Sequence, residues 1–233
     1  MEYDVAPRER FGALLRESRL YAVTDDVLEP AQLYAAVGRA LRGGVRIFQF
    51  RDKHRSDRER VSLGRSLIEL IRAASGLMIV NDRADLALAM GADGVHLGQD
   101  DLPVQFGREL MGPDLIVGAS ASFLEEIGTA TAAGADYIGF GAVFPTGTKL
   151  DAEFAGLDLF EAACQASSLP VVGIGGITVE RAPAVVARGA AGVAVVSALF
   201  RAPDVELAGR SLLQAVAPSA PESRGPRKAT LPG

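Results

Sequence analysis

A short stretch of the chain joins a strand-like pattern to charged residues. The run VRIFQFRDKHR begins like a buried β-strand and then places Gln49, Arg51 and Lys53 at alternate positions. Because successive strand side chains point to opposite faces, these three are expected on the same face as Val45 and Ile47. Polar groups on an apolar face cost free energy unless a partner or ligand meets them. A solvated rim of charges explains Lys53 but not the whole triplet, so we interpret the three as ligand-binding residues.

Carboxylates follow the next two strand-like runs. Asn81 and Asp82 come directly after LMIV, and Asp101 stands in VHLGQDD after the following run. Either of the first two would also serve as the N-cap of the next helix. However, carboxylates on adjacent loops suit Mg2+, which prefers oxygen ligands and keeps water positions for substrate phosphates. With Arg51 and Lys53 nearby, we interpret Asp82 and Asp101 as a Mg2+ site for a phosphorylated ligand.

Hydroxyl groups and glycines after the later runs suit a second anion. Ser120 ends the run LIVGAS, and Ser197 ends GVAVVS. Gly176 follows VVGIG and lets the backbone approach a ligand closely. The loop GAVFPTGTKL would also suit a plain surface turn, but it offers two hydroxyls, a flexible glycine and a cation: Thr146, Gly147, Thr148 and Lys149. Two anion sites indicate two phosphorylated substrates, or one substrate with phosphate at both ends.

These residues stand at the ends of eight β-like runs that alternate with amphipathic or Ala-rich helical segments. The alternation predicts an α/β fold, most simply a single-domain (β/α)8 TIM barrel, with a doubly wound open sheet as the alternative. Active sites of such barrels lie at the C-terminal strand ends, where the candidate residues fall. We expect an N-terminal helical extension at 1–18, the catalytic barrel at 19–216 and a disordered tail at 217–233, which is rich in Pro, Ser and Gly.

A weak internal repeat supports the barrel. Gly43-Gly44, Gly91, Gly134 and Gly189 each stand just before an even-numbered run, about two strand–helix units apart. Glycine is the residue that a left-handed helix C-cap requires. The repeat therefore predicts four helices that end in the same way.

Composition and single residues restrict the partners. The net charge of −5, with acids and bases mixed, does not indicate a nucleic-acid or membrane surface. No apolar run approaches the ~20 residues of a membrane span, and the charged N-terminus lacks the core of a secretion signal, so we expect a cytoplasmic protein. Cys164, the one cysteine, is interpreted as a buried structural thiol, His96 as a hydrogen-bonded strand residue and His54 as exposed. The sequence leaves open a homo-oligomer of a chain whose expected ligands are small phosphorylated molecules.

Five segments together resemble thiamine phosphate synthases, over about residues 19–200: QFRDK, NDRADLALAMGADGVHLGQDD, YIGFGAVFPTGTK, VVGIGGIT and GVAVVSALF. The resemblance implies a (β/α)8 transferase that joins the pyrophosphate ester of hydroxymethylpyrimidine to a carboxylated thiazole phosphate. The products would be thiamine phosphate, pyrophosphate and carbon dioxide. It also implies a Mg2+ cofactor and a dissociative, carbocation-like departure of pyrophosphate.

The resemblance assigns roles to matching positions. Residues matching the pyrimidine-pyrophosphate contacts are Gln49, Arg51, Lys53, Asn81, Ser120 and Lys149. Residues matching the thiazole-phosphate contacts are Thr146, Gly147, Thr148, Gly176, Val196 and Ser197. Asp82 and Asp101 match the Mg2+ ligands, and the catalytic roles are expected from Arg51, Lys53, Ser120 and Lys149.

The chain departs from the family pattern at two positions. Ser122 stands where the family commonly has histidine, and Ala142 stands where it commonly has proline after Gly141. Neither is an anion-binding position. Two alternative functions are a thiazole tautomerase with the same barrel and a catalytically silent sensor of thiamine phosphates. The tautomerase has no pyrophosphate leaving group, so it does not need the aspartate pair together with Gln49, Arg51 and Lys53.

Overall fold

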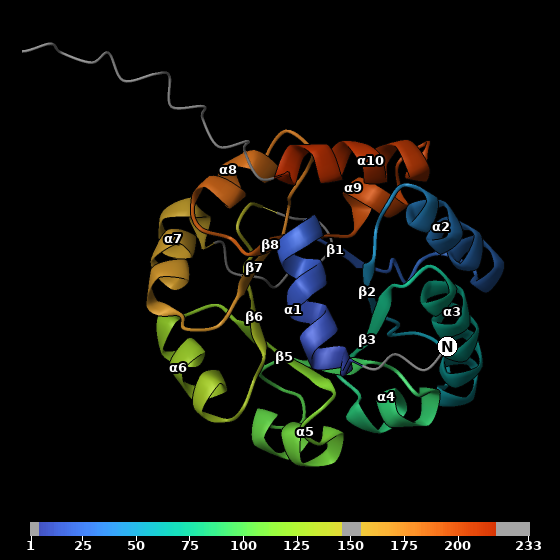
Figure 1. Cartoon of the computed structure of the whole chain (residues 1–233), viewed down its shortest axis with the longest axis horizontal. Helices are drawn as coiled ribbons and strands as arrows, with labels where there is room; N and C mark the ends of the chain where they lie inside the picture. Colours follow the sequence, from blue (N-terminus) through green and yellow to red (C-terminus); the bar gives the residue numbers. More distant parts are fainter. Residues whose placement is uncertain (1–4, 146–154, 218–233) are drawn as a thin grey trace, which may run out of the picture.

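The computed structural model describes residues 5–145 and 155–217. Within them, parallel strands close into a barrel whose order follows the sequence from β1 to β8, each strand pairing with its chain neighbours and β8 with β1 (Figure 1). The strands are β1 (Leu20–Val23), β2 (Ile47–Phe50), β3 (Leu77–Asn81), β4 (Gly94–Leu97), β5 (Ile116–Ala121), β6 (Tyr137–Phe140), β7 (Val171–Ile174) and β8 (Gly192–Val195). The predicted (β/α)8 barrel is confirmed, and the open sheet is excluded because β1 pairs with β8.

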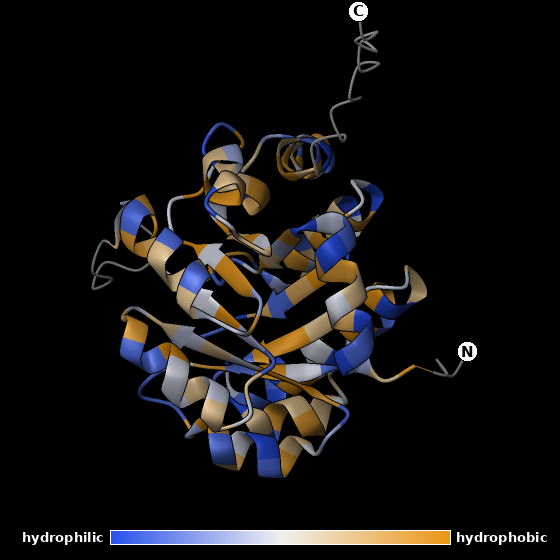
Figure 2. Cartoon of the chain, turned by 60° about the vertical axis from the view of Figure 1, so that its left-hand side comes forward, coloured by the Kyte–Doolittle hydropathy of each residue, from blue (hydrophilic) through white to orange (hydrophobic). Residues whose placement is uncertain are grey.

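Helices surround the barrel on its outside, except α1, which lies across one end of it (Figure 1). They are α1 (Pro7–Ser18), α2 (Pro30–Arg42), α3 (Asp57–Ala73), α4 (Ala84–Met90), α5 (Val104–Met111), α6 (Leu124–Ala132), α7 (Gly156–Ala166), α8 (Ala182–Ala187), α9 (Ser197–Phe200) and α10 (Val205–Val216). In Figure 2 the outer helices carry both polar and apolar residues, as expected for elements with one buried side. Over the described ranges, no helix combines the length and apolar character that crossing a bilayer demands.

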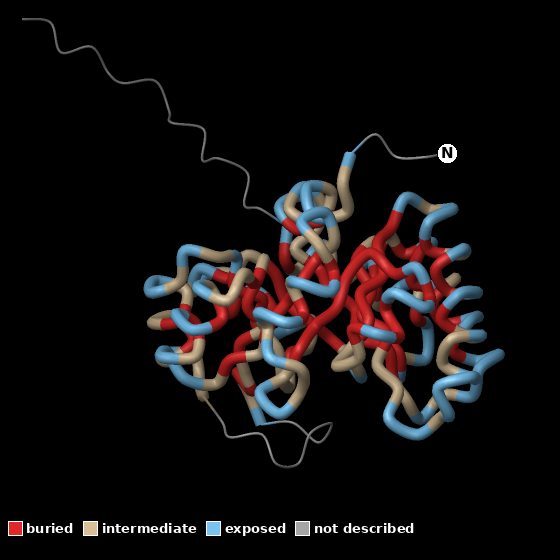
Figure 3. The backbone as a smooth tube through the Cα atoms, turned by 90° about the horizontal axis from the view of Figure 1, so that it is seen from below, coloured by how far each residue is buried: buried red, intermediate tan, exposed pale blue. Residues whose placement is uncertain are grey.

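Strand side chains alternate between two cores. Phe48 and Phe50 point outward into the layer between strands and helices, whereas Ile47 belongs to the core inside the barrel. Figure 3 shows the buried residues concentrated inside the ring of helices. The expectation for Val45 is wrong: β2 begins only at Ile47, so Val45 precedes the alternation and packs outward, where a Cβ on Gly209 of α10 would lie 3.3 Å from it.

Helix α1 closes the N-terminal end of the barrel. It begins with Pro7, whose fixed φ suits the first helical turn, and buries Phe11 and Leu15 one turn apart. The centroid of the Phe11 ring lies 4.7 Å from that of Tyr137 and 6.5 Å from that of Tyr21. Phe11 therefore covers the inner core at the N-terminal end of the barrel. In Figure 1 the helix crosses in front of the barrel centre. In the part of the chain that the structure describes, no helix covers the opposite, C-terminal end of the barrel in this way.

The predicted helix ends are confirmed. Gly44, Gly91, Gly134 and Gly189 have φ of 98°, 73°, 94° and 97°. In the Gly43-Gly44 pair the second glycine, not the first, takes the left-handed conformation. Each such turn redirects the chain from a helix into the next even-numbered strand.

Candidate active site

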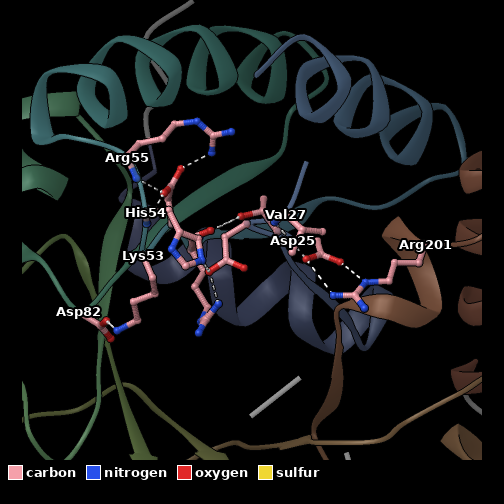
Figure 4. A network of polar contacts seen from close by, with 11 residues as sticks. Asp25, Val27, Lys53, His54, Arg55, Asp82 and Arg201 are labelled. Atoms are coloured by element: carbon pink, nitrogen blue, oxygen red, sulfur yellow. Dashed lines mark hydrogen bonds and ion pairs between the residues drawn. The ribbon is translucent and has the colours of Figure 1, made fainter. Parts of the chain in front are cut away.

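The loop after β2 carries the first group of candidate residues. Gln49 points into the barrel and is buried, while Arg51 and Lys53 follow the end of the strand. The backbone of Arg51 is fixed by Thr24 of the loop after β1, which exchanges hydrogen bonds of 2.9 and 3.0 Å with it. The guanidinium of Arg51 forms an ion pair of 2.7 Å with Asp26. The ammonium group of Lys53 forms an ion pair with Asp82 after β3 (Figure 4).

The same loop is held rigid by a buried carboxylate. Asp52 accepts hydrogen bonds of 3.0 Å from the backbone N–H groups of His54 and Arg55, and one of 2.5 Å from the Arg55 guanidinium. Burial raises the pKa of Asp52, but these hydrogen bonds outweigh it and hold the pKa below its ordinary value. Arg55 also donates to the carbonyl of Leu28, at 2.7 Å. These hydrogen bonds join the loops after β1 and β2, and they hold in place the loop that carries Arg51 and Lys53. The His54 side chain is exposed, as expected.

Asp82 and Asp101 come together as the sequence predicted. Asp82 adopts a φ of 65° and its N–H donates to the carbonyl of His96, at 2.7 Å. Oδ2 of Asp101 accepts a hydrogen bond of 2.7 Å from the N–H of Gly98. Burial raises the pKa of Asp101, and a hydrogen bond and negative charge from Asp82 raise it further. The two carboxylates thus lie within hydrogen-bond reach of one another and disfavour each other's charge.

This pair fits a divalent cation. Two close carboxylates of like charge gain from a cation between them, and Mg2+ commonly binds one or two carboxylates and fills its other positions with water and substrate oxygens. Within residues 5–145 and 155–217, no larger cluster of acidic, histidine or cysteine side chains has the spacing of metal ligands. A cavity of about 200 Å³ opens beside the pair, lined by residues that include Lys53, Asn81, Asp82 and Asp101. The remaining ligands would therefore come from solvent or substrate.

Strands β7 and β8 contribute backbone rather than charge. Gly176 has a φ of 61°, and a Cβ there would lie 2.5 Å from the carbonyl oxygen of Pro145. The N–H of Phe144 donates to the carbonyl of Gly175, at 3.1 Å, so the loop after β6 lies directly against the loop after β7. Val196 precedes α9, and Ser197 is its first residue. Gly176, Val196 and Ser197 therefore lie at the same barrel end as the charged group.

Four of the predicted site residues cannot be compared with the structure. Thr146, Gly147, Thr148 and Lys149 lie outside the described residues. The last described residue before them is Pro145, which is next to Gly176. Their proposed roles remain predictions.

A buried chain of polar side chains crosses the inside of the barrel below this site. Nε2 of Gln49 donates to the hydroxyl of Tyr21 at 2.9 Å, and the hydroxyls of Tyr21 and Tyr137 lie 2.7 Å apart. Nδ1 of His96 lies 2.9 Å from the Tyr137 hydroxyl, and Nε2 lies 3.0 Å from Oγ of Ser120. Burial lowers the pKa of His96 to about 4, although the charge of Asp82 acts to raise it. The interpretation of His96 as a hydrogen-bonded strand residue is confirmed.

Sequence reasoning missed several of these groups. Tyr21 and Tyr137 carry polar groups at inward strand positions, the signal that identified Gln49, but neither was singled out from the sequence. Asp25 and Asp26 follow β1 as Asp82 follows β3, and this parallel was overlooked. Asp25 is buried and pairs with Arg201 after α9, at 2.5 Å (Figure 4). Asp26 and Asp25 thus connect the loop after β1 to the loops after β2 and β8.

Other sequence expectations can be compared directly. Cys164 lies on α7 and is half-buried rather than fully buried; burial, with the charge of Glu161, raises its pKa to about 11, so it is not a ready nucleophile. At the first departure from the family pattern, the hydroxyl of Ser122 donates to the carbonyl of Gly141, at 3.3 Å. At the second, Ala142 is buried.

Comparison with known proteins gives one consistent result. The family model described as thiamine monophosphate synthase matches residues 20–199. The chain is 48% identical over 195 residues to the thiamine-phosphate synthase of Chlorobium luteolum, which covers 83% of this chain and 91% of that protein. It is 51% identical over 185 residues to that of Natronomonas pharaonis, covering 78% and 86%. Among solved structures, thiamine phosphate pyrophosphorylase from Pyrococcus furiosus matches with a TM-score of 0.80 at 41% identity, over 87% of this chain and 97% of that one.

Proposed function

The chain belongs to the thiamine monophosphate synthase family, and on that premise we propose how its residues join two phosphorylated substrates. The family consists of transferases, and the proposed reaction couples the pyrophosphate ester of hydroxymethylpyrimidine with a carboxylated thiazole phosphate. Thiamine phosphate, pyrophosphate and carbon dioxide leave as products. Neither the tautomerase nor the sensor has support among the compared relatives, which are thiamine-phosphate synthases.

One observation carries the assignment of roles: two cations and two close carboxylates meet at one end of the barrel. Arg51 and Lys53 lie on the loop after β2 that Asp52 and Arg55 hold in place. Lys53 forms an ion pair with Asp82 and lines one cavity with Asp82 and Asp101. Negative charge grows on the oxygens of a departing pyrophosphate, and fixed positive groups aimed at it stabilise the transition state more than the ground state. A Mg2+ ion held by Asp82 and Asp101 would neutralise part of that charge.

The remaining residues position the substrates. Gln49 and Asn81, at the ends of β2 and β3, would orient the pyrimidine, while Ser120 would contact the diphosphate from β5. Gly176, Val196 and Ser197 would hold the phosphate of the thiazole, with Thr146–Lys149 completing both sites. Pyrophosphate departs first, and the thiazole nitrogen then attacks the carbocation-like pyrimidine CH2 that is left behind, so the main contribution of the protein is positioning. Such a displacement demands no protein nucleophile, which agrees with a half-buried Cys164 of raised pKa and a buried, neutral His96.

The decisive experiment is a coupled assay with both substrates and Mg2+. We expect pyrophosphate release that depends on the thiazole phosphate and is matched by thiamine phosphate. Reactions that omit one substrate, or that contain EDTA, are the controls. Pyrophosphate release without coupled product would contradict a synthase and would instead indicate simple hydrolysis.

A further inference from the structure

We propose that Tyr21, Tyr137 and His96 are positioning residues. They form a hydrogen-bond chain from Gln49 to Ser120 in which each side chain donates to the next, so that the hydroxyl hydrogen of Ser120 points to the substrate. The five side chains come from β2, β1, β6, β4 and β5 and form one continuous path inside the barrel. The inference rests on the proposed function only for what the substrate is. The direction of the path is a property of the protein alone.

The direction follows from the donors available at each step. Gln49 donates its Nε2–H to the oxygen of Tyr21. Either hydroxyl could donate across the 2.7 Å between Tyr21 and Tyr137, but a phenol has a single hydrogen, and among the described residues that of the buried Tyr21 has its acceptor in Tyr137. Tyr21 therefore donates to Tyr137. Tyr137 is then left to donate to Nδ1 of His96. A neutral imidazole that accepts at Nδ1 carries its hydrogen on Nε2, and this hydrogen is donated to Oγ of Ser120.

This order of donors determines where the hydroxyl hydrogen of Ser120 points. Because its oxygen accepts from His96, its own hydrogen is free to point elsewhere, and Ser120 lies near the C-terminal end of β5, where the barrel faces the site. The opposite direction would make Ser120 donate downward to His96 and present only lone pairs to the pocket. A lone pair would repel a pyrophosphate oxygen, whereas a hydrogen would stabilise it.

The protonation states agree with this order. Because Nδ1 of His96 accepts the hydrogen of Tyr137 in this order, the imidazole is neutral, and its side chain is buried. Burial raises the pKa of Tyr21 and that of Tyr137. Both phenols therefore keep the hydrogens that the path requires. Helix α1 excludes water from below, because Phe11 packs on both tyrosine rings.

The barrel is shaped to hold the path. A Cβ on Gly118 of β5 would lie 2.3 Å from the ring of Tyr137, and a Cβ on Gly139 of β6 would lie 3.0 Å from the His96 ring. Both glycines occupy inward strand positions, next to Tyr137 and Ser120 in the register of the sheet. At these two positions the absence of a side chain makes room for the phenol and the imidazole. Ordinary core packing would fill such inward positions with apolar side chains.

The first test measures the tautomer of His96 directly by 15N NMR. The chain has two histidines, and His54 is exposed, so a His54→Gln variant assigns the signals. We expect His96 at pH 7.5 as the Nε2–H tautomer, and we expect Tyr137→Phe to weaken that preference. Tyr34→Phe, on the exposed side of α2, should leave it unchanged. The Nδ1–H tautomer, or an even mixture in the unmodified protein, would overturn the proposal whether or not the protein makes thiamine phosphate.

The second test separates positioning from stability by kinetics. Tyr137→Phe should lower kcat about tenfold, the effect of one misdirected hydrogen bond in the transition state, with little change in KM. Ile116→Val, which trims the same inner core away from the path, is the matched control for loss of stability. Equal kcat for the two variants would overturn the proposal. If the unmodified protein releases no coupled product, the proposed function fails, but the tautomer measurement still decides the direction of the path.

Discussion

Nη1 of Arg51 lies 2.7 Å from Oδ2 of Asp26, so a cation on the loop after β2 is held by a carboxylate on the loop after β1. Only about a quarter of the Arg51 side chain is exposed, at 27%, and Asp26 is more buried at 12%. Because a guanidinium has five N–H donors in a fixed fork, Arg51 can keep Asp26 as a partner and still bind an anion. Asp26 therefore determines where the guanidinium stands.

We predict that Asp26→Asn lowers kcat/KM about tenfold while changing the free energy of unfolding by less than ~1 kcal/mol. The amide still accepts a hydrogen bond but no longer holds the guanidinium by charge. Steady-state kinetics and urea unfolding measure the two effects. Asp158→Asn is the control, since Asp158 forms a surface ion pair with Arg188 while its side chain is 98% exposed. A loss of activity no greater than that of the control would contradict the role of Asp26.

The metal site gives a second prediction. Asp101→Asn should raise the Mg2+ concentration needed for half-maximal activity by about tenfold or more, because one of two carboxylate ligands is lost. Without metal, the same change should leave the melting temperature unchanged or raise it, because it removes a partly buried negative charge and its repulsion by Asp82, which together raise the pKa of Asp101. Mg2+ titrations of activity and of thermal stability check both statements. Asp100→Asn, one residue away and exposed, serves as the control. An unchanged Mg2+ requirement in Asp101→Asn would remove Asp101 from the ligand set.

The buried histidine predicts how stability depends on pH. The pKa of His96 is about 4 in the folded protein, against 6.5 for an ordinary histidine, so between these values the unfolded chain binds more protons. The contribution of His96 to stability is therefore complete above pH 6.5 and is lost as the pH falls toward 4, by up to about 3 kcal/mol. Urea unfolding between pH 7.5 and 4.5 should show this loss, and His96→Gln should lack it. An identical pH dependence in the variant would show that His96 does not stay neutral.

Close packing inside the barrel gives a prediction for two glycines. Gly118→Ala should lower the free energy of unfolding by about 1–3 kcal/mol, because the new Cβ would lie 2.3 Å from the Tyr137 ring. Gly128→Ala, in α6, should be neutral or stabilising by up to ~1 kcal/mol, since a Cβ there meets nothing within 4 Å and alanine favours helix. Thermal and urea unfolding of both variants give the comparison. Equal effects at the two positions would mean that the barrel interior adapts easily around Tyr137.

Local sequence patterns were enough to place most of the candidate site. The alternation of inward and outward residues predicts Gln49 on the inner face, and the rule that parallel strands end at one rim brings Asp82 near Asp101. The same reasoning failed for Val45, because the point at which a strand begins depends on pairing with its neighbours rather than on the residues themselves. It could not find Asp26 as the partner of Arg51, since that contact joins two loops that are separated by a helix.

The sequence by itself determined the repeating strand–helix units, the polarity at each strand end and the resemblance that these ends carry. Those features depend on residue type and on spacing of a few positions, which the chain fixes locally. Closure of the barrel decided the rest. It brings Tyr21 within 2.7 Å of Tyr137, 116 residues away, and joins His96 to Ser120 across β4 and β5. Which inward side chains meet depends on the register and curvature of all the strands at once, and no local pattern contains that information.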